Sequence, residues 1–126
     1  MGEAYDVMAA TCPSRTVLHR IGARWTIFVV TALAERDEPM RFTELKSRIQ
    51  GITPKVLTET LRALEVDGLV CRVDHDENPP RVDYALTHLG ASLWEPLQAV
   101  RAWAENHVPE ILEAQERSEA RTAMAG

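Results

Sequence analysis

Cys12 carries the most distinctive chemistry in the N-terminal part of the chain. It directly precedes Pro13, which places its thiol at or next to the start of a predicted helix, with Arg15 close by. Helix N-termini and nearby cations stabilise a thiolate, so Cys12 is a candidate for reaction with oxidants and electrophiles. A cysteine at a helix start can equally be structural, and the sequence leaves both interpretations open.

Basic and polar side chains form the second chemical group, and most of them lie on one predicted helix that begins after Thr53. Arginine and lysine donate to phosphates and favour guanine, whereas glutamate favours the N4 group of cytosine. We predict seven residues in contact with DNA: Arg41, Thr53, Lys55, Thr58, Glu59, Arg62 and Arg81. A charged helix face taken alone is usually only solvated. The placement of these side chains on one helix and beside the tip of a hairpin favours DNA contact.

Two helices are predicted around this group. In the first, apolar residues recur at helical spacing at Phe42, Leu45 and Ile49, Thr43 is a suitable N-cap, and Gly51 ends the helix. The second starts with a hydroxyl cap followed by proline, Thr53 and Pro54, and Gly68 is placed to stop it in the left-handed conformation. Its inward stripe comprises Val56, Leu57, Leu61 and Leu64.

Beyond Gly68 the apolar period changes to two, which predicts a hairpin with a Pro-stiffened tip and with Arg81 at the base of that tip. Leu69, Cys71 and Val73 share one face of the first strand, and Val82, Tyr84 and Leu86 alternate in the same way along the second. Cys71 is expected on the inner face, where a free cysteine behaves as a small buried hydrophobe. Helix, turn, helix and hairpin together predict a winged helix-turn-helix, whose second helix has about the right size for a DNA major groove.

Further helices flank this unit. Residues 13–21 predict a short helix, and residues 25–35 are apolar almost all round, as is typical of a central buried helix that has Trp25 in the core. A long helix is predicted after Thr87, a suitable N-cap. Pro96 should kink this helix, and a second break is expected near Pro109.

The long C-terminal helix has an apolar stripe that needs a partner. The stripe comprises Leu89, Leu93, Trp94, Leu97, Val100, Trp103 and Ala104. So large an apolar surface on a small winged domain predicts a homodimer, which also suits a palindromic DNA site. The tail from about Glu116 to Gly126 is expected to fray.

Length, composition and missing motifs argue against a multidomain, a membrane or an enzyme class for this chain. The 126 residues suit one domain with a modest core. The sequence has neither a signal-peptide pattern nor a run of 18 uncharged apolar residues, so we expect a cytoplasmic protein without membrane contact. It also lacks a phosphate-cradling glycine loop, a metal-ligand spacing of Cys and His, and an acid to orient His19 near Cys12. We therefore expect no enzyme activity, no cofactor and no metal.

The net charge of −5 by itself disfavours binding to nucleic acid, because non-specific affinity comes largely from neutralised phosphates. The charge is unevenly distributed, however. Residues 41–81 hold seven Lys or Arg against seven Asp or Glu, whereas residues 82–126 hold three against seven. Most of the excess acid therefore lies outside the predicted DNA-contacting segment.

The chain resembles the HxlR family of bacterial transcriptional regulators, relatives of the MarR-type winged-helix proteins. The resemblance rests on three blocks in this order: CPSRTVLHRIGARWT at 12–26, RFTELKSRIQGITPKVLTETLRALEVDGLV at 41–70, and PPRVDYALTHLG at 79–90. It implies a homodimer with residues 53–62 as the recognition helix, a wing near Arg81 and a dimer made by the terminal helices. It also implies, for some relatives, a response to oxidants or electrophiles through a cysteine at the position of Cys12.

We therefore expect a mainly helical winged helix-turn-helix protein with a small β-hairpin wing, in one domain over residues 1–126. Residues 41–90 would form the DNA-binding core, and residues 12–36 and 88–115 the dimerisation and support helices. The expected partners are a palindromic double-stranded DNA operator and a second copy of the chain.

Three hypotheses for how the chain works remain open. In the first, the DNA-binding regulator is switched by oxidation at Cys12. In the second, a small-molecule effector binds near Trp94 or Trp103. In the third, the winged domain serves protein interaction without DNA binding, which only the acidic balance favours.

Overall fold

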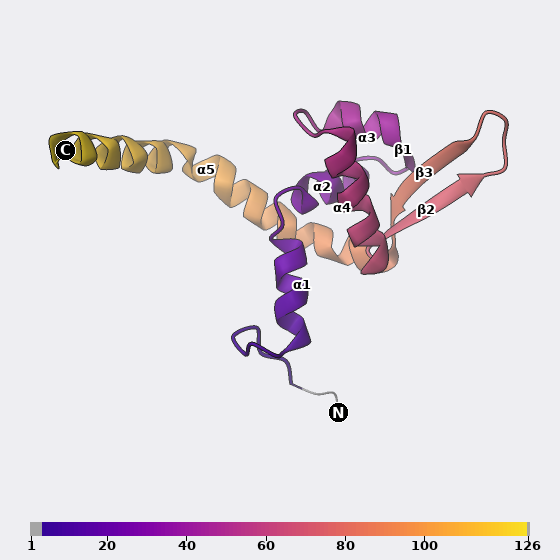
Figure 1. Cartoon of the computed structure of the whole chain (residues 1–126), viewed down its shortest axis with the longest axis horizontal. Coiled ribbons are helices and arrows are strands. Elements are labelled where there is room, and N and C mark those ends of the chain that lie inside the picture. Colours follow the sequence, from indigo (N-terminus) through magenta and orange to yellow (C-terminus); the bar gives the residue numbers. More distant parts are fainter. Residues whose placement is uncertain (1–3, 126) are drawn as a thin grey trace. The chain divides into compact units, whose positions relative to one another are not determined.

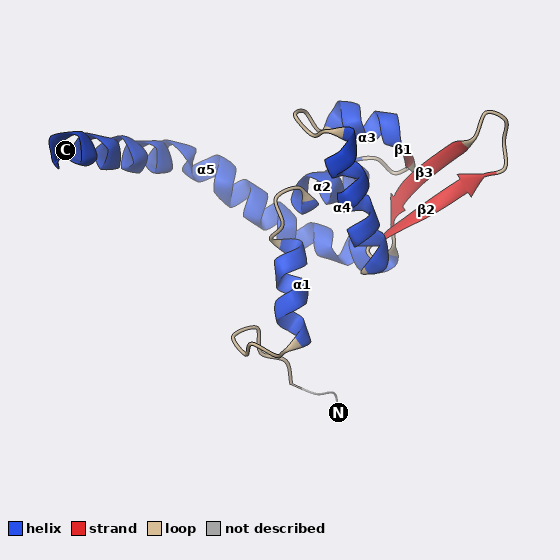
Figure 2. Ribbon diagram, in the orientation of Figure 1, coloured by secondary structure: helices blue, strands red, loops and turns tan. Residues whose placement is uncertain are grey.

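The computed structural model describes residues 4–125. Its helices and strands, in chain order, are α1 (Pro13–Ile21), α2 (Thr26–Glu35), β1 (Met40–Arg41), α3 (Phe42–Arg48), α4 (Pro54–Val66), β2 (Val70–His75), β3 (Arg81–Leu86) and α5 (His88–Ala125). The chain forms two compact units, Met1–Trp94 and Glu95–Gly126, and α5 runs through the boundary. The predicted fold class, mainly helical with a small β wing, is confirmed (Figure 2).

The core of the first unit lies between α2, α3, α4 and the sheet. Its buried apolar residues are Val29, Ala32, Leu33, Met40, Leu45, Ile49, Ile52, Leu57, Leu61, Leu64 and Val70. Three of the four residues predicted for the inward stripe of the second helix are at most 1% exposed, namely Leu57, Leu61 and Leu64. The helical spacing of these leucines therefore identified the buried face of α4 correctly.

The predicted N-cap of α3 is wrong. The helix already begins at Phe42, so Thr43 lies inside the first turn, and the Arg41 amide donates to Glu44 Oε1 at 3.0 Å. A carboxylate three residues into the helix thus satisfies a donor at the helix start, as in one half of a capping box. After Arg48 the chain turns through Gly51, whose φ of +88° is the left-handed conformation that glycine adopts without strain.

The sheet has three antiparallel strands in the order β1-β3-β2. The sequence predicted β2 and β3 but not the two-residue β1, whose Met40 pairs with Tyr84 and whose Arg41 pairs with Asp83. Figure 1 shows the hairpin of β2 and β3 projecting beyond the helices of this unit as a wing. It turns through residues 76–80.

The predicted inner face of β2 is wrong, because Val70 is 3% exposed whereas Cys71 is exposed and Val73 is 41% exposed. Leu69 still belongs to the turn that leaves α4, and the strand begins at Val70. Alternation along the strand therefore starts one residue later than predicted, which moves the cysteine to the other face. Cys71 is accordingly an accessible thiol.

Helix α2 is central but not buried all round. Val29, Val30, Ala32 and Leu33 are buried, whereas Phe28 is 49% exposed. The ring of Phe28 lies 5.5 Å from that of Trp25, which packs against the core and has Arg24 5.0 Å above its centroid. One edge of α2 therefore presents an aromatic surface.

Thr87 caps α5 as predicted. Its Oγ1 accepts a hydrogen bond from the Gly90 amide at 3.0 Å and donates to the Gly68 carbonyl at 2.6 Å. The same side chain therefore starts α5 and attaches that start to the turn after α4.

The predicted end of α5 is wrong. Pro96 and Pro109 both lie inside one helix that continues to Ala125, so neither the break near Pro109 nor the frayed tail is present in residues 4–125. The sequence from Glu113 onward, EAQERSEARTAMA, is rich in strong helix formers. High intrinsic propensity explains why the helix extends beyond its apolar stripe.

The helix segment of the second unit, from Glu95 onward, carries exposed apolar residues. Val100 is 58% and Trp103 57% exposed, and the others are Val108 at 47%, Ile111 at 40% and Leu112 at 50%. Leu97, which was predicted in the same stripe, is buried. The exposed apolar stripe of α5 is therefore defined here as Val100, Trp103, Val108, Ile111 and Leu112.

Candidate nucleic-acid interface

Helix α4 turns a polar face to solvent opposite its buried leucines. Lys55, Glu59 and Arg62 are exposed and Thr58 is partly exposed. The Lys55 ammonium lies 4.0 Å from Glu59 Oε1, and their side chains are 85% and 61% exposed. An exposed ion pair of this kind contributes little to stability, so both side chains can turn to another partner. Four of the seven predicted residues therefore belong to one exposed helix surface.

Thr53 sets where that surface begins. It is the N-cap of α4, and its Oγ1 accepts a hydrogen bond from the Val56 amide at 3.2 Å. Pro54 fills the first helical position, where the missing N–H costs nothing. The predicted cap is confirmed, and the hydroxyl of Thr53 is used for it, although its hydrogen remains available as a donor.

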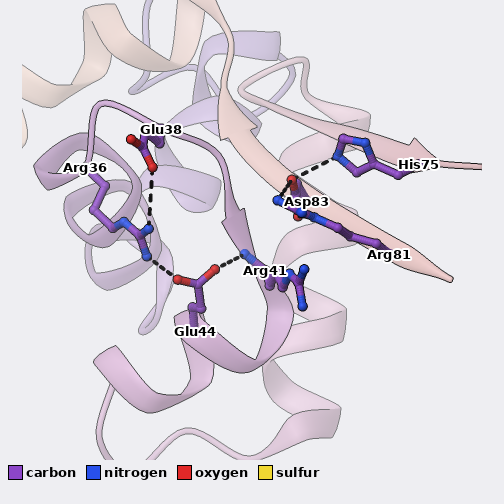
Figure 3. A network of polar contacts seen from close by, with 7 residues as sticks. All are labelled: Arg36, Glu38, Arg41, Glu44, His75, Arg81 and Asp83. Atoms are coloured by element: carbon purple, nitrogen blue, oxygen red, sulfur yellow. Dashed lines mark hydrogen bonds and ion pairs between the residues drawn. The ribbon is translucent and has the colours of Figure 1, made fainter. Parts of the chain in front are cut away.

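Arg81 stands at the first position of β3, and its guanidinium binds Asp83 on the same strand. Nε donates to Asp83 Oδ1 at 3.2 Å and Nη2 donates to Oδ2 at 3.1 Å. His75 Nε2 lies 2.9 Å from the same Oδ2. Figure 3 shows the two side chains converging on the carboxylate from neighbouring strands. The predicted wing arginine is therefore held in place by an acid that is not among the seven residues predicted to contact DNA.

Asp83 and Arg81 each stabilise the charged form of the other. The Arg81 guanidinium, and then His75, hold the pKa of Asp83 below its usual range against the effect of burial, and Asp83 in turn raises the pKa of Arg81. Asp83 is only 3% exposed, so an unpaired carboxylate would be costly there. The sequence signal that could have identified it is the spacing Arg81, Val82, Asp83, because residues two apart on a strand share a face.

Arg41 joins the same region from a distant part of the sequence. Its Cα pairs with that of Asp83 across β1 and β3, and its side chain is exposed. Its backbone amide is bound by Glu44, which also forms an ion pair with Arg36 (Figure 3). The Arg36 guanidinium is the main reason why the pKa of Glu44 is lowered. Arg41 and Arg81 are thus both neighbours of Asp83 on the sheet, one across the strands and one along β3, whereas the α4 residues form a separate surface.

Cys12 is the N-cap residue of α1 and is partly exposed. Its Sγ lies 3.0 Å from Ser14 Oγ and accepts a hydrogen bond from the Asp6 amide at 3.3 Å. Hydrogen bonds from the Ser14 side chain, the Ser14 backbone and the Asp6 backbone lower the pKa of the Cys12 thiol. The lowered pKa agrees with the sequence analysis, but its cause is hydrogen bonding rather than the nearby Arg15.

A pocket of about 310 Å³ lies in the first unit beside the start of α5. Its walls are Leu33, Ala34, Arg36, Asp37, Glu38, Pro39, Ala85, Leu86, Ala91 and Trp94. Within residues 4–125, His, Cys, Asp and Glu form no group of three that could hold a metal ion. No single helix in that range is long and apolar enough to cross a membrane. Helices α1 and α2 together have the length and apolar composition of a span, but they are bent by 68° relative to each other.

Known proteins are similar to this chain in sequence and in fold. The model of the HxlR-like helix-turn-helix family matches residues 20–112. The HTH-type transcriptional regulator YtfH of Escherichia coli is 38% identical over 107 residues, which cover 85% of this chain and 83% of YtfH. The solved structure of the transcriptional regulator ytfH from Salmonella typhimurium is 36% identical with a TM-score of 0.80, and the match covers 90% of this chain and 99% of that one.

A further solved structure is the reduced form of the transcriptional regulator YodB from B. subtilis. It is 33% identical with a TM-score of 0.65, and the match covers 78% of this chain and 95% of YodB. These relatives are transcriptional regulators and not enzymes. The family match extends from the end of α1 through the wing into α5, and it includes the capped helix α4 with its exposed polar face. The chain therefore belongs to the HxlR family of helix-turn-helix transcriptional regulators.

Proposed function

We propose that this chain binds a palindromic double-stranded DNA operator as a homodimer and that α4 of each copy enters the major groove. The observation that carries the proposal is the polar face of α4, where Lys55 and Arg62 stand opposite three fully buried leucines. An α-helix fits the major groove, and lysine and arginine there meet phosphates or guanine edges. Glu59 on the same face would accept a hydrogen bond from cytosine N4.

The wing supplies the second contact. Arg81 at the start of β3 binds Asp83, Arg41 on β1 is the cross-strand partner of Asp83, and both arginines would meet the phosphate backbone beside the groove. Phosphate contacts fix the position of a protein on the duplex, whereas base contacts in the groove read the sequence. The two surfaces therefore have different roles: α4 specifies the operator and the wing fixes the register.

A dimer is required for a palindromic site, and the exposed apolar stripe of α5 supports one. Five large apolar residues lie partly in solvent on one helix of the second unit, and α1 exposes Val17 and Leu18 at 57% and 51%. Burial of apolar surface contributes about 25 cal/mol per Å². A second copy of the chain would cover these side chains and hold two recognition helices one groove repeat apart, about 34 Å.

Replacement of Arg62 by Ala tests the recognition surface. We expect specific affinity to fall by about 1 to 3 kcal/mol in a folded protein, measured by fluorescence titration at fixed salt on a duplex selected from a random pool by the unmodified protein. Arg117→Ala, which removes the same charge from an exposed position on α5, is the matched control. Unchanged affinity in a folded Arg62→Ala protein would remove Arg62 from the proposed interface.

The finer part of the proposal is control through Cys12. Support comes from the hydrogen-bonded, partly exposed thiol at the α1 N-terminus and from the relative YodB, which has been solved in reduced and diamide-treated forms. Diamide oxidises thiols, and a thiolate is the form that reacts. An adduct or disulfide at Cys12 would change the packing of α1, whose exposed apolar residues belong to the proposed dimer surface.

The test of this control compares DNA affinity before and after mild oxidation in a Cys71→Ser background, because Cys71 is exposed and would react as well. We expect loss or gain of affinity only in proteins that retain Cys12. An equal response in the Cys12→Ser, Cys71→Ser protein would contradict a sensor at this position, as would no response while mass spectrometry shows Cys12 modified.

A small-molecule effector is the second candidate for control, and the pocket beside Trp94 favours it. Its volume of about 310 Å³ is at the small end of ligand sites, and it combines an aromatic wall with the charged side chains of Arg36, Asp37 and Glu38. An effector of this kind would release DNA from the Cys12→Ser protein but not from Trp94→Ala. Release of DNA from the Trp94→Ala protein but not from the Cys12→Ser protein would assign control to the thiol.

A further inference from the structure

Asp83 occupies an unusual position for a buried carboxylate. Its neighbours on β3, Val82 and Tyr84, are both partly buried, and Tyr84 packs against the hydrophobic core. Side chains alternate along a strand, so Asp83 lies on the face directed away from that core. It is nevertheless only 3% exposed. Something other than the apolar core must therefore cover it.

Two side chains from the outer end of the hairpin contact the Asp83 carboxylate. Arg81 shares the face of Asp83 because it lies two residues away on β3, and His75 is the cross-strand partner of Arg81. Both carboxylate oxygens are used: Oδ1 accepts from Arg81 Nε, and Oδ2 contacts Arg81 Nη2 and His75 Nε2. Figure 3 shows this convergence. Asp83 therefore binds two ionisable side chains of the wing at one point.

The bidentate contact fixes the direction of the guanidinium but does not use all of it. Arginine has five N–H donors, and Asp83 takes one from Nε and one from Nη2. The Arg81 side chain is still 38% exposed, so the rest of the group reaches solvent. Arg41, the β1 partner of Asp83, presents a second exposed guanidinium beside it. Asp83 thus relates two arginines that are 40 residues apart in the sequence, because its carboxylate binds Arg81 and its cross-strand partner on β1 is Arg41.

We propose that Asp83 is a positioning residue of the DNA interface, which holds Arg81 beside Arg41 so that the two guanidinium groups meet neighbouring phosphates of one strand. The inference rests on the proposed function, because it requires that Arg81 contacts DNA. It adds a role for an acid, a residue type that DNA repels. Orientation by Asp83 reduces the side-chain freedom that Arg81 would otherwise lose on binding.

The proposal predicts an effect of opposite sign from simple electrostatics. Removal of a negative charge next to DNA strengthens binding if nothing else changes, because less repulsion opposes the phosphates. Loss of a positioning carboxylate instead weakens binding, because the freed guanidinium no longer points at its phosphate. Asp74 on the same hairpin supplies the matched control, since it is exposed and bound only to Arg72 among the interactions described for residues 4–125.

The experiment measures affinity and its salt dependence for Asp83→Asn, Asp74→Asn, Arg81→Ala and the double variant Asp83→Asn, Arg81→Ala on the selected duplex. We expect Asp83→Asn to bind roughly fivefold or more weakly and to lower the slope of log K against log salt by up to about one, the signature of one lost phosphate contact. Asp74→Asn should bind as well as or better than the unmodified protein. The double variant should bind no worse than Arg81→Ala.

Each alternative has its own outcome. Full affinity and full salt slope in Arg81→Ala would contradict the wing contact of the proposed function, and the role of Asp83 would fail with it. Loss in Arg81→Ala without loss in Asp83→Asn would contradict the positioning role alone. Additive losses in the double variant would show that Asp83 acts on the fold rather than through Arg81.

Stability is checked separately by thermal melting. Should Asp83→Asn prove unfolded at the assay temperature, Asp83→Glu keeps the charge and moves the carboxylate by one methylene. The proposal then expects reduced affinity and reduced salt slope in a folded Asp83→Glu protein. Unmodified binding by that variant would overturn it, because a displaced carboxylate cannot hold the same guanidinium geometry.

Discussion

Gly90 lies so close to the backbone of Leu69 that a Cβ atom at position 90 would be 2.0 Å from the Leu69 carbonyl oxygen. The same carbonyl accepts a hydrogen bond from the Thr87 amide at 3.0 Å. The first turn of α5 is therefore packed directly against the chain segment that enters β2. Only a residue without a side chain fits there, and the reason is close approach, since no positive φ is involved.

The Gly90→Ala variant should be destabilised by about 2 kcal/mol or more, because the added methyl meets rigid backbone and the helix must shift. Urea denaturation monitored by circular dichroism measures the change. Ser92→Ala, at an exposed position on the same helix, is the control. Its free energy of unfolding should stay within about 0.5 kcal/mol of that of the unmodified protein. Full stability of Gly90→Ala would mean that α5 starts further from β2.

Thr53→Ala should lower the free energy of unfolding by about 1 kcal/mol, because the Val56 amide loses the hydroxyl that caps α4. Thr53→Ser keeps the hydroxyl and should retain most of the stability. Chemical denaturation of the three proteins decides the matter. Equal losses in the alanine and serine variants would trace the effect to the lost methyl group rather than to the cap.

The Cys12 thiol should be alkylated by iodoacetamide at lower pH than a free thiol, whose pKa is about 8.5. The hydrogen bonds from Ser14 and Asp6 favour the thiolate and hold its pKa down. In a Cys71→Ser background, the rate should rise with pH through a midpoint below that value. Ser14→Ala removes the largest cause and should move the midpoint upward. A midpoint that Ser14→Ala leaves unchanged would contradict this origin of the shift.

Ile111→Asp should convert dimers to monomers, because a charge in a buried apolar seam has no partner. Ile111 is 40% exposed in the single chain, so the substitution should leave each copy folded. Sedimentation at micromolar concentration gives the oligomeric state. Ala102→Asp places the same charge on the opposite side of the helix and should leave the dimer intact. A monomeric unmodified protein would exclude paired half-sites.

The sequence alone determined the features that depend on neighbouring residues. Thr53 and Thr87 cap their helices as predicted, because a hydroxyl at a helix start finds its amide within three residues. Gly68 takes the positive φ predicted for the glycine that stops α4. Gly51 also has a positive φ, but α3 already ends at Arg48, so the predicted end of that helix at Gly51 is wrong. The spacing of Leu57, Leu61 and Leu64 identified the buried face of α4, and hence the polar surface opposite.

Only the tertiary structure decided what depends on pairing between distant segments. The two-residue β1 carries too little pattern to predict, yet its register with β3 places Arg41 opposite Asp83. Cys71 changed faces because the first residue of β2 is set by the turn after α4. Burial of Asp83 arises from the register of two strands, and alternation along one strand cannot reveal what a neighbouring strand supplies. Local hydrogen bonds are encoded within a few residues, whereas strand register is fixed by the packing of the whole unit.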